Sequence, residues 1–224
     1  MKFNMQERIL VFAPHNDDEL IGLGGTLAKL AQRGNQVTVC EVTAGYNPER
    51  VARIQGEAKK AHRILGVGKQ YFLNLPVVKL GEVSQMELTK RFAEVVAEVR
   101  PTIAFIPHIG DMHTDHRITA DTAMVVLRPY EAKDLHTIYA YETLSETEWN
   151  MPTVTNAFMP DTWFDITDTL DTKLRAMECY ETQLNAFPHP RSLEAIKALA
   201  RYRGSTVGCE AAEAFCTIRR IVRM

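Results

Sequence analysis

The sequence predicts a three-layer α/β sandwich whose mostly parallel sheet carries an active site at its carboxyl edge. Short apolar runs of strand length alternate with longer segments of helical periodicity, beginning close to the amino terminus. The 224 residues, 46% hydrophobic and 24% charged, suit one ordinary globular core. We therefore expect a single domain that spans residues 1–224.

The first four elements have the clearest boundaries. Their order is strand, helix, strand, helix, over residues 9–13, 20–32, 37–43 and 51–65. Gly34 and Gly66 follow the two helices, where a glycine commonly ends a helix. Strands that alternate with helices in this way favour parallel pairing, because each helix returns the chain to the same edge of the sheet.

The same alternation continues to the end of the chain. Strands are predicted at 71–73, 102–107, 137–142 and 163–166, and helices at 87–99, 115–127, 169–184 and 193–203. Pro101 ends the helix before it. The segment 144–160 is the least regular, so we expect a long loop that forms one wall of a pocket. Together these elements predict a doubly wound, Rossmann-like sheet.

Composition excludes several classes of partner. A net charge of −2 and a pI near 6.4 argue against nucleic acid or an anionic membrane as a partner. No apolar stretch is long enough to span a bilayer, and residues 1–8 lack the apolar core of an export signal. We expect a cytoplasmic protein whose four cysteines stay reduced and structural, namely Cys40, Cys179, Cys209 and Cys216.

Two clusters of histidine and aspartate follow two predicted strands. Residues 13–19 read Ala-Pro-His-Asn-Asp-Asp-Glu, and residues 113–117 read His-Thr-Asp-His-Arg. Because the carboxyl ends of parallel strands meet at one edge of a sheet, the two clusters are predicted to converge. Together they indicate one metal site.

His15, Asp18 and His116 are the proposed metal ligands. Two imidazoles and one carboxylate suit Zn²⁺ and leave a fourth position for water, as catalytic rather than structural zinc sites do. Zinc lowers the pKa of bound water to roughly 7, provided that a base accepts the proton. Asp17, adjacent to the ligand Asp18, is the predicted base. A mixed nitrogen and oxygen site also accepts Fe²⁺, Co²⁺ or Mn²⁺.

These motifs resemble those of the LmbE/PIG-L-type zinc N-deacetylases. Residues 13–19 resemble the family's Ala-His-Pro-Asp-Asp-Glu signature, with proline before rather than after the histidine, and residues 113–117 resemble its second motif. Arg53 with residues 57–58 resembles the family's Arg-x-x-Glu-Ala helix, and 202–215 resembles its closing segment. The resemblance covers nearly the whole chain.

The resemblance assigns a role to each matching residue. It implies zinc binding by His15, Asp18 and His116, and a general base at Asp17. It implies that His113, positively charged, stabilises the oxyanion and that Asp115 orients it. Either Asp17 or His113 then protonates the leaving amine, and Arg53 contacts substrate. The substrate implied is an N-acetylated amino sugar or its conjugate, and the alternative within the family is an amidase that acts on the C–N amide of a thiol-sugar conjugate. A homo-oligomer is compatible with the resemblance.

Each residue also has a plainer interpretation. An acidic run such as 17–19 often complements a helix dipole, and Asp115 could act only as a helix N-cap. Arg53 lies on a charged helix, where a solvated position is equally expected. The sequence leaves the role of several other residues open or favours a structural one, namely His108, Asp111, His189, Arg191, His62, His136, Glu213 and Phe215.

Three competing functions follow from the same residues. Residues 22–25, Gly-Leu-Gly-Gly, suggest a nucleotide-binding turn, but the motif is incomplete and the three acids before it would repel phosphate. Two histidines and one carboxylate also form the site of Fe(II) oxygenases, which a requirement for dioxygen would reveal. A third possibility is a protein that binds a sugar without converting it. Retention of both Asp17 and His113 argues for catalysis.

Overall fold

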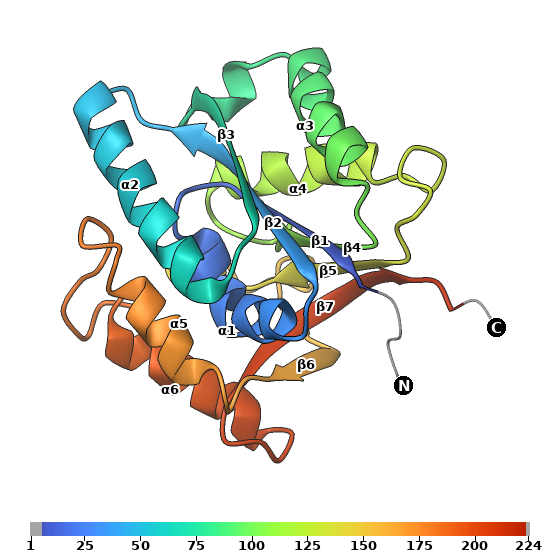
Figure 1. Ribbon diagram of the computed structural model, residues 1–224. Coiled ribbons are helices and arrows are strands. Elements are labelled where there is room, and N and C mark those ends of the chain that lie inside the picture. Colours follow the sequence, from blue (N-terminus) through green and yellow to red (C-terminus); the bar gives the residue numbers. More distant parts are fainter. Residues whose placement is uncertain (1–5, 223–224) are drawn as a thin grey trace.

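The computed structural model describes residues 6–222 and consists of one sheet between two layers of helices (Figure 1). The predicted lack of an export signal concerns residues that lie largely outside this range. The strands are β1 (Arg8–Ala13), β2 (Gln36–Ala44), β3 (Lys69–Pro76), β4 (Ile103–Pro107), β5 (Thr137–Tyr141), β6 (Thr162–Asp165) and β7 (Ala212–Arg220). The helices are α1 (Asp18–Gln32), α2 (Pro48–Leu65), the 3-10 turn η1 (Leu80–Glu82), α3 (Gln85–Val99), α4 (Thr114–Val126), α5 (Leu170–Met177) and α6 (Leu193–Ser205).

The sheet has the order β3-β2-β1-β4-β5-β7-β6. The first five strands in this order are parallel, whereas β7 runs antiparallel to both β5 and β6. This confirms the predicted α/β class with a mostly parallel sheet. The chain moves outward from β1 in both directions, so β1 and β4 form the switch point of the sheet, where ligands bind in such folds.

Each face of the sheet has its own hydrophobic core. Alternate residues of β1 point to opposite sides, so that Val11 packs with α1, α2 and α5 while Phe12 packs with α3 and α4. Phe12 stacks on Phe92 of α3, with the ring centroids 4.6 Å apart. Because β1 is buried on both faces, its sequence is continuously apolar, and this is why the run 9–13 is so clear a signal.

The structure differs from the predicted elements in one helix that is shorter than expected and in one strand that the sequence did not reveal. The predicted helix 169–184 ends at Met177, because Tyr180 instead turns inward and donates to Glu19 while Thr182 donates to Glu57. Strand β7 was not predicted. Its second half is largely polar and half exposed, and its partners β5 and β6 are remote in sequence, so local periodicity carries little trace of it.

The glycines of α1 are explained by close packing rather than by a nucleotide. A Cβ atom on Gly22 would lie 2.4 Å from the ring of Tyr141, and one on Gly25 would lie 2.8 Å from Ile166. The helix is interrupted at Leu23, where the backbone leaves helical φ and ψ values. Helix α1 therefore needs small residues and a break in order to fit against β5 and the turn after β6.

Glu213 of β7 binds the backbone N–H groups that the break in α1 leaves without a helical partner. Its carboxylate accepts hydrogen bonds from the backbone N–H groups of Gly25 (3.0 Å) and Thr26 (2.7 Å). Lys173 of α5 lies 2.6 Å from the same carboxylate and donates to the carbonyl of Ile21 (2.8 Å). Glu213 thus joins the last strand to the first helix. Its role, which the sequence left open, is structural.

The sequence predicted no disulfide bonds and no membrane-spanning helix. All four cysteines are unpaired, as expected. Within residues 6–222, no helix combines the length and the hydropathy that crossing a bilayer would require.

We expect Glu213→Ala to lower the free energy of unfolding by about 3 kcal/mol, because Lys173 would remain buried and unpaired. Urea denaturation measures this change. The matched control is Asp168→Ala, which removes the exposed partner of Lys29 and should cost less than about 1 kcal/mol. The double variant Lys173→Met, Glu213→Leu should be more stable than Glu213→Ala. Equal losses in Glu213→Ala and the control would contradict this role.

Candidate metal centre and its surroundings

The first half of the site is built by the turn between β1 and α1. Strand β1 ends at Ala13, and α1 begins at Asp18, so residues 14–17 turn at the carboxyl edge of the sheet. Oδ2 of Asp18 accepts the backbone N–H of His15 at 2.9 Å, which fixes the turn. The same oxygen lies 3.1 Å from Nδ1 of His15.

The second half comes from the loop after β4 and the first turn of α4. His116 is fully buried, and its Nε2 lies 3.1 Å from Oδ2 of Asp18 and 3.3 Å from Nδ1 of His15. The edges of a tetrahedron around zinc, with bonds of 2.0 to 2.2 Å, measure about 3.3 to 3.6 Å. The three predicted ligand atoms are therefore spaced nearly as a metal ion requires.

Each histidine of this trio is oriented from behind by a carboxylate. Nε2 of His15 lies 3.3 Å from Oδ2 of Asp115, and Nδ1 of His116 lies 2.8 Å from Oδ2 of Asp111. Thr147 donates to the other oxygen of Asp111 at 2.6 Å. Metal-binding histidines in proteins commonly have such a partner on the second ring nitrogen, because it fixes the tautomer. Asp111, left open by the sequence, is thus a positioning residue.

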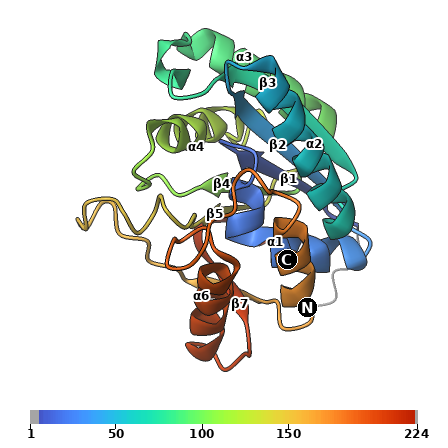
Figure 2. The same cartoon turned by 90° about the vertical axis from the view of Figure 1, so that its left-hand side faces the viewer.

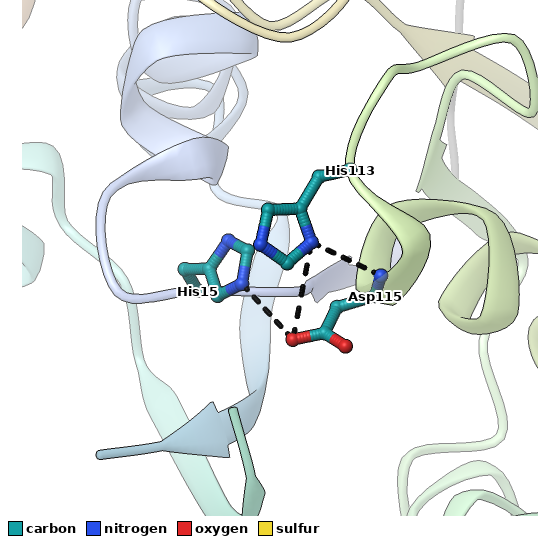
Figure 3. A group of neighbouring side chains, drawn as sticks. All are labelled: His15, His113 and Asp115. Atoms are coloured by element: carbon teal, nitrogen blue, oxygen red, sulfur yellow. Dashed lines mark hydrogen bonds and ion pairs between the residues drawn. The ribbon is translucent and has the colours of Figure 1, made fainter. Parts of the chain in front are cut away.

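A second trio, His15, His113 and Asp115, fits a metal less well (Figure 3). Its atoms already have partners: Nδ1 of His113 accepts the backbone N–H of Asp115 at 3.1 Å, and Oδ2 of Asp115 accepts the N–H of Val78 at 2.7 Å. By contrast, Nδ1 of His15, Oδ2 of Asp18 and Nε2 of His116 lie 3.1 to 3.3 Å apart, whereas Nδ1 of His113 lies 3.9 Å from Oδ2 of Asp115. The donor set of His15, Asp18 and His116 is therefore the one that matches an ion.

The Asp18 carboxylate and the two histidines of this trio favour one another's charged forms. Burial alone would lower the pKa of both histidines, but the Asp18 carboxylate raises the pKa of His15 to about 9 and that of His116 to about 10. The pKa of Asp18 is held well below its usual range, against burial, by His116 and His15. The site thus attracts positive charge, which either protons or a metal ion can supply.

Asp17 lies beside the trio in an unusual backbone conformation. Its φ angle is 151°, a region that residues other than glycine rarely occupy, and its side chain is 1% exposed. Oδ2 is 3.1 Å from the Arg191 guanidinium, whereas Oδ1 is buried and has no protein partner. Burial raises the pKa of Asp17 to about 7, against the opposing effect of Arg191.

His113 is held as a neutral ring. Its Nδ1 accepts the backbone N–H of Asp115, so the ring proton resides on Nε2. Burial, together with the neighbouring His15, lowers the pKa of His113 to about 4. The family resemblance implied a positive charge on His113, with the ring oriented by Asp115. In the structure the Asp115 carboxylate lies nearer to His15, at 3.3 Å, than to Nδ1 of His113, at 3.9 Å.

Backbone strain gathers around the site. Val78 has a φ of 66° and Ser145 a φ of 74°, in addition to Asp17. The strained Val78 directs its N–H at Asp115, and the hydroxyl of Ser145 accepts a hydrogen bond from Nε of Arg191 at 2.9 Å. Residues in such conformations concentrate where the surrounding structure holds a site in place.

Arg191 is the main functional candidate that the sequence left open. It contacts Asp17, lies 3.6 Å from Glu146 and approaches Asp18 at 4.0 Å. The only sequence signal was its place in a proline-rich turn before α6. Because Arg191 and Asp17 lie 174 residues apart, only the fold brings them together.

Arg53 lies outside this cluster. Its guanidinium pairs with Glu57 and Glu181, each at 3.2 Å, and its side chain is 59% exposed. His108 interacts with the carbonyl of Asn156 at 3.0 Å, which anchors the loop between β5 and β6. A role of Arg53 toward substrate stays a prediction.

A further buried group lies behind the site. Nε2 of His62 is 2.8 Å from Glu19 and 3.7 Å from Glu41, and all three side chains are fully buried. Tyr180 also donates to Glu19, at 3.0 Å. Burial raises the pKa of Glu41 well above its usual range, which favours a neutral Glu41 beside a His62–Glu19 pair. His62, assigned to structure from the sequence, anchors α2 to α1 and β2.

Fold and geometry together define a Rossmann-like α/β protein with a candidate metal centre of two histidines and one aspartate at the switch point. The family model for PIG-L, GlcNAc-PI de-N-acetylase, matches residues 10–127, which include both motifs. The chain belongs to this family.

Individual relatives agree with this assignment. The chain is 27% identical to diacetylchitobiose deacetylase of Thermococcus kodakarensis, over 94% of the chain and 83% of that protein. The conserved protein TT1542 of Thermus thermophilus has a TM-score of 0.78 and 26% identity, covering 98% of both chains. GalB, the 4-carboxy-2-hydroxymuconate hydratase of Pseudomonas putida, has a TM-score of 0.76 at 21% identity, covering 98% of this chain and 99% of its own. The likeness to GalB is one of fold alone.

We expect Asp111→Ala to weaken the affinity for a divalent metal by about 10- to 100-fold, because His116 loses the carboxylate that orients it. Competition with a chromophoric chelator measures this affinity. Asp121→Ala, an exposed change on α4, the helix that carries His116, is the matched control and should leave the affinity unchanged. Unchanged affinity in Asp111→Ala would remove Asp111 from the metal site.

Proposed function

We propose that this protein is a metal-dependent hydrolase that removes an N-acetyl group from an amino sugar or an amino-sugar conjugate. The observation that carries the proposal is the unpartnered Oδ1 of Asp17, buried beside three atoms spaced as metal ligands. Membership of the PIG-L family and the likeness to a diacetylchitobiose deacetylase support the substrate class.

His15, Asp18 and His116 would hold the ion. Two imidazole nitrogens and one carboxylate oxygen suit Zn²⁺, and Fe²⁺, Co²⁺ and Mn²⁺ are the alternatives that the same donors accept. When bound, such an ion supplies a Lewis acid and makes water a stronger nucleophile at neutral pH. Asp115 and Asp111 hold the two imidazoles in the required tautomers.

Asp17 is the proton carrier of the proposed reaction. Its free Oδ1 accepts a proton from the water that attacks the amide carbonyl carbon. When the bond between carbon and nitrogen breaks, Asp17 returns this proton to the leaving amine, so that acetate and a free amino sugar result. Arg191 keeps the carboxylate in place through Oδ2.

His113 donates a hydrogen bond to the carbonyl oxygen as negative charge develops on it. Nδ1 is already engaged by a backbone N–H, so Nε2–H is the group available to the substrate. A neutral donor stabilises an oxyanion without a change in protonation. Because the ring takes up no proton at Nδ1, His113 is a poor proton carrier, which leaves that role to Asp17.

Asp17→Asn is expected to reduce kcat for acetate release by about 10²- to 10⁴-fold, because the amide cannot accept a proton. The assay measures acetate released from a panel of N-acetylated amino sugars, with metal content determined for each variant. Unchanged metal content must accompany the loss. Full activity in Asp17→Asn would exclude Asp17 as the base. Zinc-loaded wild-type protein that releases no acetate from any member of the panel would overturn the proposed substrate class.

His113→Ala is expected to reduce kcat by about 10²- to 10³-fold with little change in metal content, because one donor to the oxyanion is lost. The ratio of kcat between the wild type and His113→Ala should stay constant between pH 6 and 8, because a neutral ring does not titrate there. The control is His136→Ala, a change at the opposite edge of the sheet. Loss of the metal in His113→Ala would instead assign His113 to the ligand set.

A further inference from the structure

Exposed apolar side chains gather around the candidate active site. The loops after β2, β3, β4 and β5 and the segment before α6 each contribute such residues. We call six of them the apolar rim: Tyr46, Val78, Met112, Trp149, Met151 and Phe187. Exposed apolar surface at the mouth of a polar site is typical of ligand binding.

The side chain of Trp149 is connected to the proposed base Asp17 through two other residues. Its indole packs against the ring of His189, with the centroids 6.2 Å apart and the planes at 77°. Nδ1 of His189 accepts the backbone N–H of Arg191 at 3.0 Å, and Arg191 contacts Asp17 at 3.1 Å. Two residues therefore connect the indole with the proposed base.

The loop that carries Trp149 is anchored on both sides of the indole. The N–H of Ser145 donates to Glu148 at 2.6 Å, and the side chain of Asn150 donates to the carbonyl of Gly110 at 2.5 Å. Gly110 precedes Asp111, which orients the ligand His116. Figure 2 shows the segment between β5 and β6 extending away from the rest of the chain. The bond from Asn150 therefore ties the residue after Trp149 to the loop that carries Asp111.

The surroundings of Trp149 suit a sugar ring. Trp149 is 52% exposed although its ring is T-shaped to that of His189, so about half of the surface of this residue stays available. A pyranose has one apolar C–H face and polar hydroxyl groups at its edge. The loop that carries Trp149 also carries Glu146 and Glu148, and Glu146 lies 3.6 Å from Arg191. Charged groups of this kind bind the hydroxyl groups of a sugar and disfavour a lipid chain.

We propose that Trp149 is a stacking platform for the sugar ring next to the one that loses its acetyl group. The proposal rests on the proposed function and narrows its substrate class to N-acetylated disaccharides and glycosides, in preference to free monosaccharides. Trp149 is thus a specificity-determining residue, and it takes no part in proton transfer.

A binding experiment tests the platform without requiring turnover. The chain has two tryptophans, so Trp163→Phe leaves Trp149 as the sole indole fluorophore. In a metal-loaded Asp17→Asn, Trp163→Phe protein, N,N′-diacetylchitobiose should produce a saturable change in emission. N-acetylglucosamine should bind about tenfold more weakly. No change in emission, or equal affinities for the two sugars, would overturn the proposal.

Kinetics provide the second test. Trp149→Ala should lower kcat/KM for the disaccharide by about tenfold and change that for the monosaccharide by less than about twofold. Trp149→Phe should restore most of the loss. Tyr130→Ala, which removes another exposed aromatic ring at the opposite edge of the sheet, is the matched control. Equal losses on both sugars in Trp149→Ala would contradict the platform.

Two further outcomes distinguish failure of the stacking platform from failure of the proposed function. If light scattering shows that Trp149→Ala lowers the molecular mass while sugar selectivity is unchanged, the rim is a contact between copies of the chain and the proposal is overturned. If wild-type protein binds the disaccharide through Trp149 but releases no acetate, the proposed function fails while the stacking platform stands.

Discussion

The carboxylate of Asp18 is the point on which the whole site depends. One oxygen lies 3.1 Å from a histidine that follows β1 and 3.1 Å from a histidine on α4, so a single negative charge holds together the loops of two different strands. Buried in an apolar fold, this charge requires compensation by protons or by a metal ion. The position of β1 beside β4 at the switch point of the sheet is what makes the arrangement possible.

Much of the surrounding structure keeps these groups in place. Asp115 and Asp111 orient the two imidazoles, and Arg191 restrains Asp17. Behind them, Glu213 accepts hydrogen bonds from the backbone at the break in α1 and pairs with Lys173. Asp18 is the first residue of this helix. Val78 and Ser145 have positive φ angles, which residues other than glycine rarely adopt. The surrounding fold therefore holds the backbone of the site in a conformation that these residues disfavour locally.

The parts of the fold that depend on local sequence could be predicted. The apolar run of β1, the helix-ending glycines and the two histidine motifs identified the sheet, the helices and the candidate ligands. The rest depends on contacts between distant segments. Strand β7 pairs with β5 and β6 across a segment that contains α5 and α6, and Arg191 meets Asp17 across 174 residues. The tautomer of His113 follows from a backbone hydrogen bond that no motif encodes.

Anomalous diffraction from crystals of the zinc-loaded protein, recorded at the zinc absorption edge, would locate the metal ion. We expect one strong peak per chain, within about 2.0 to 2.2 Å of Nδ1 of His15, Oδ2 of Asp18 and Nε2 of His116. A peak among Glu19, Glu41 and His62 instead, or no ordered zinc at all in loaded crystals, would contradict the assignment of the metal centre.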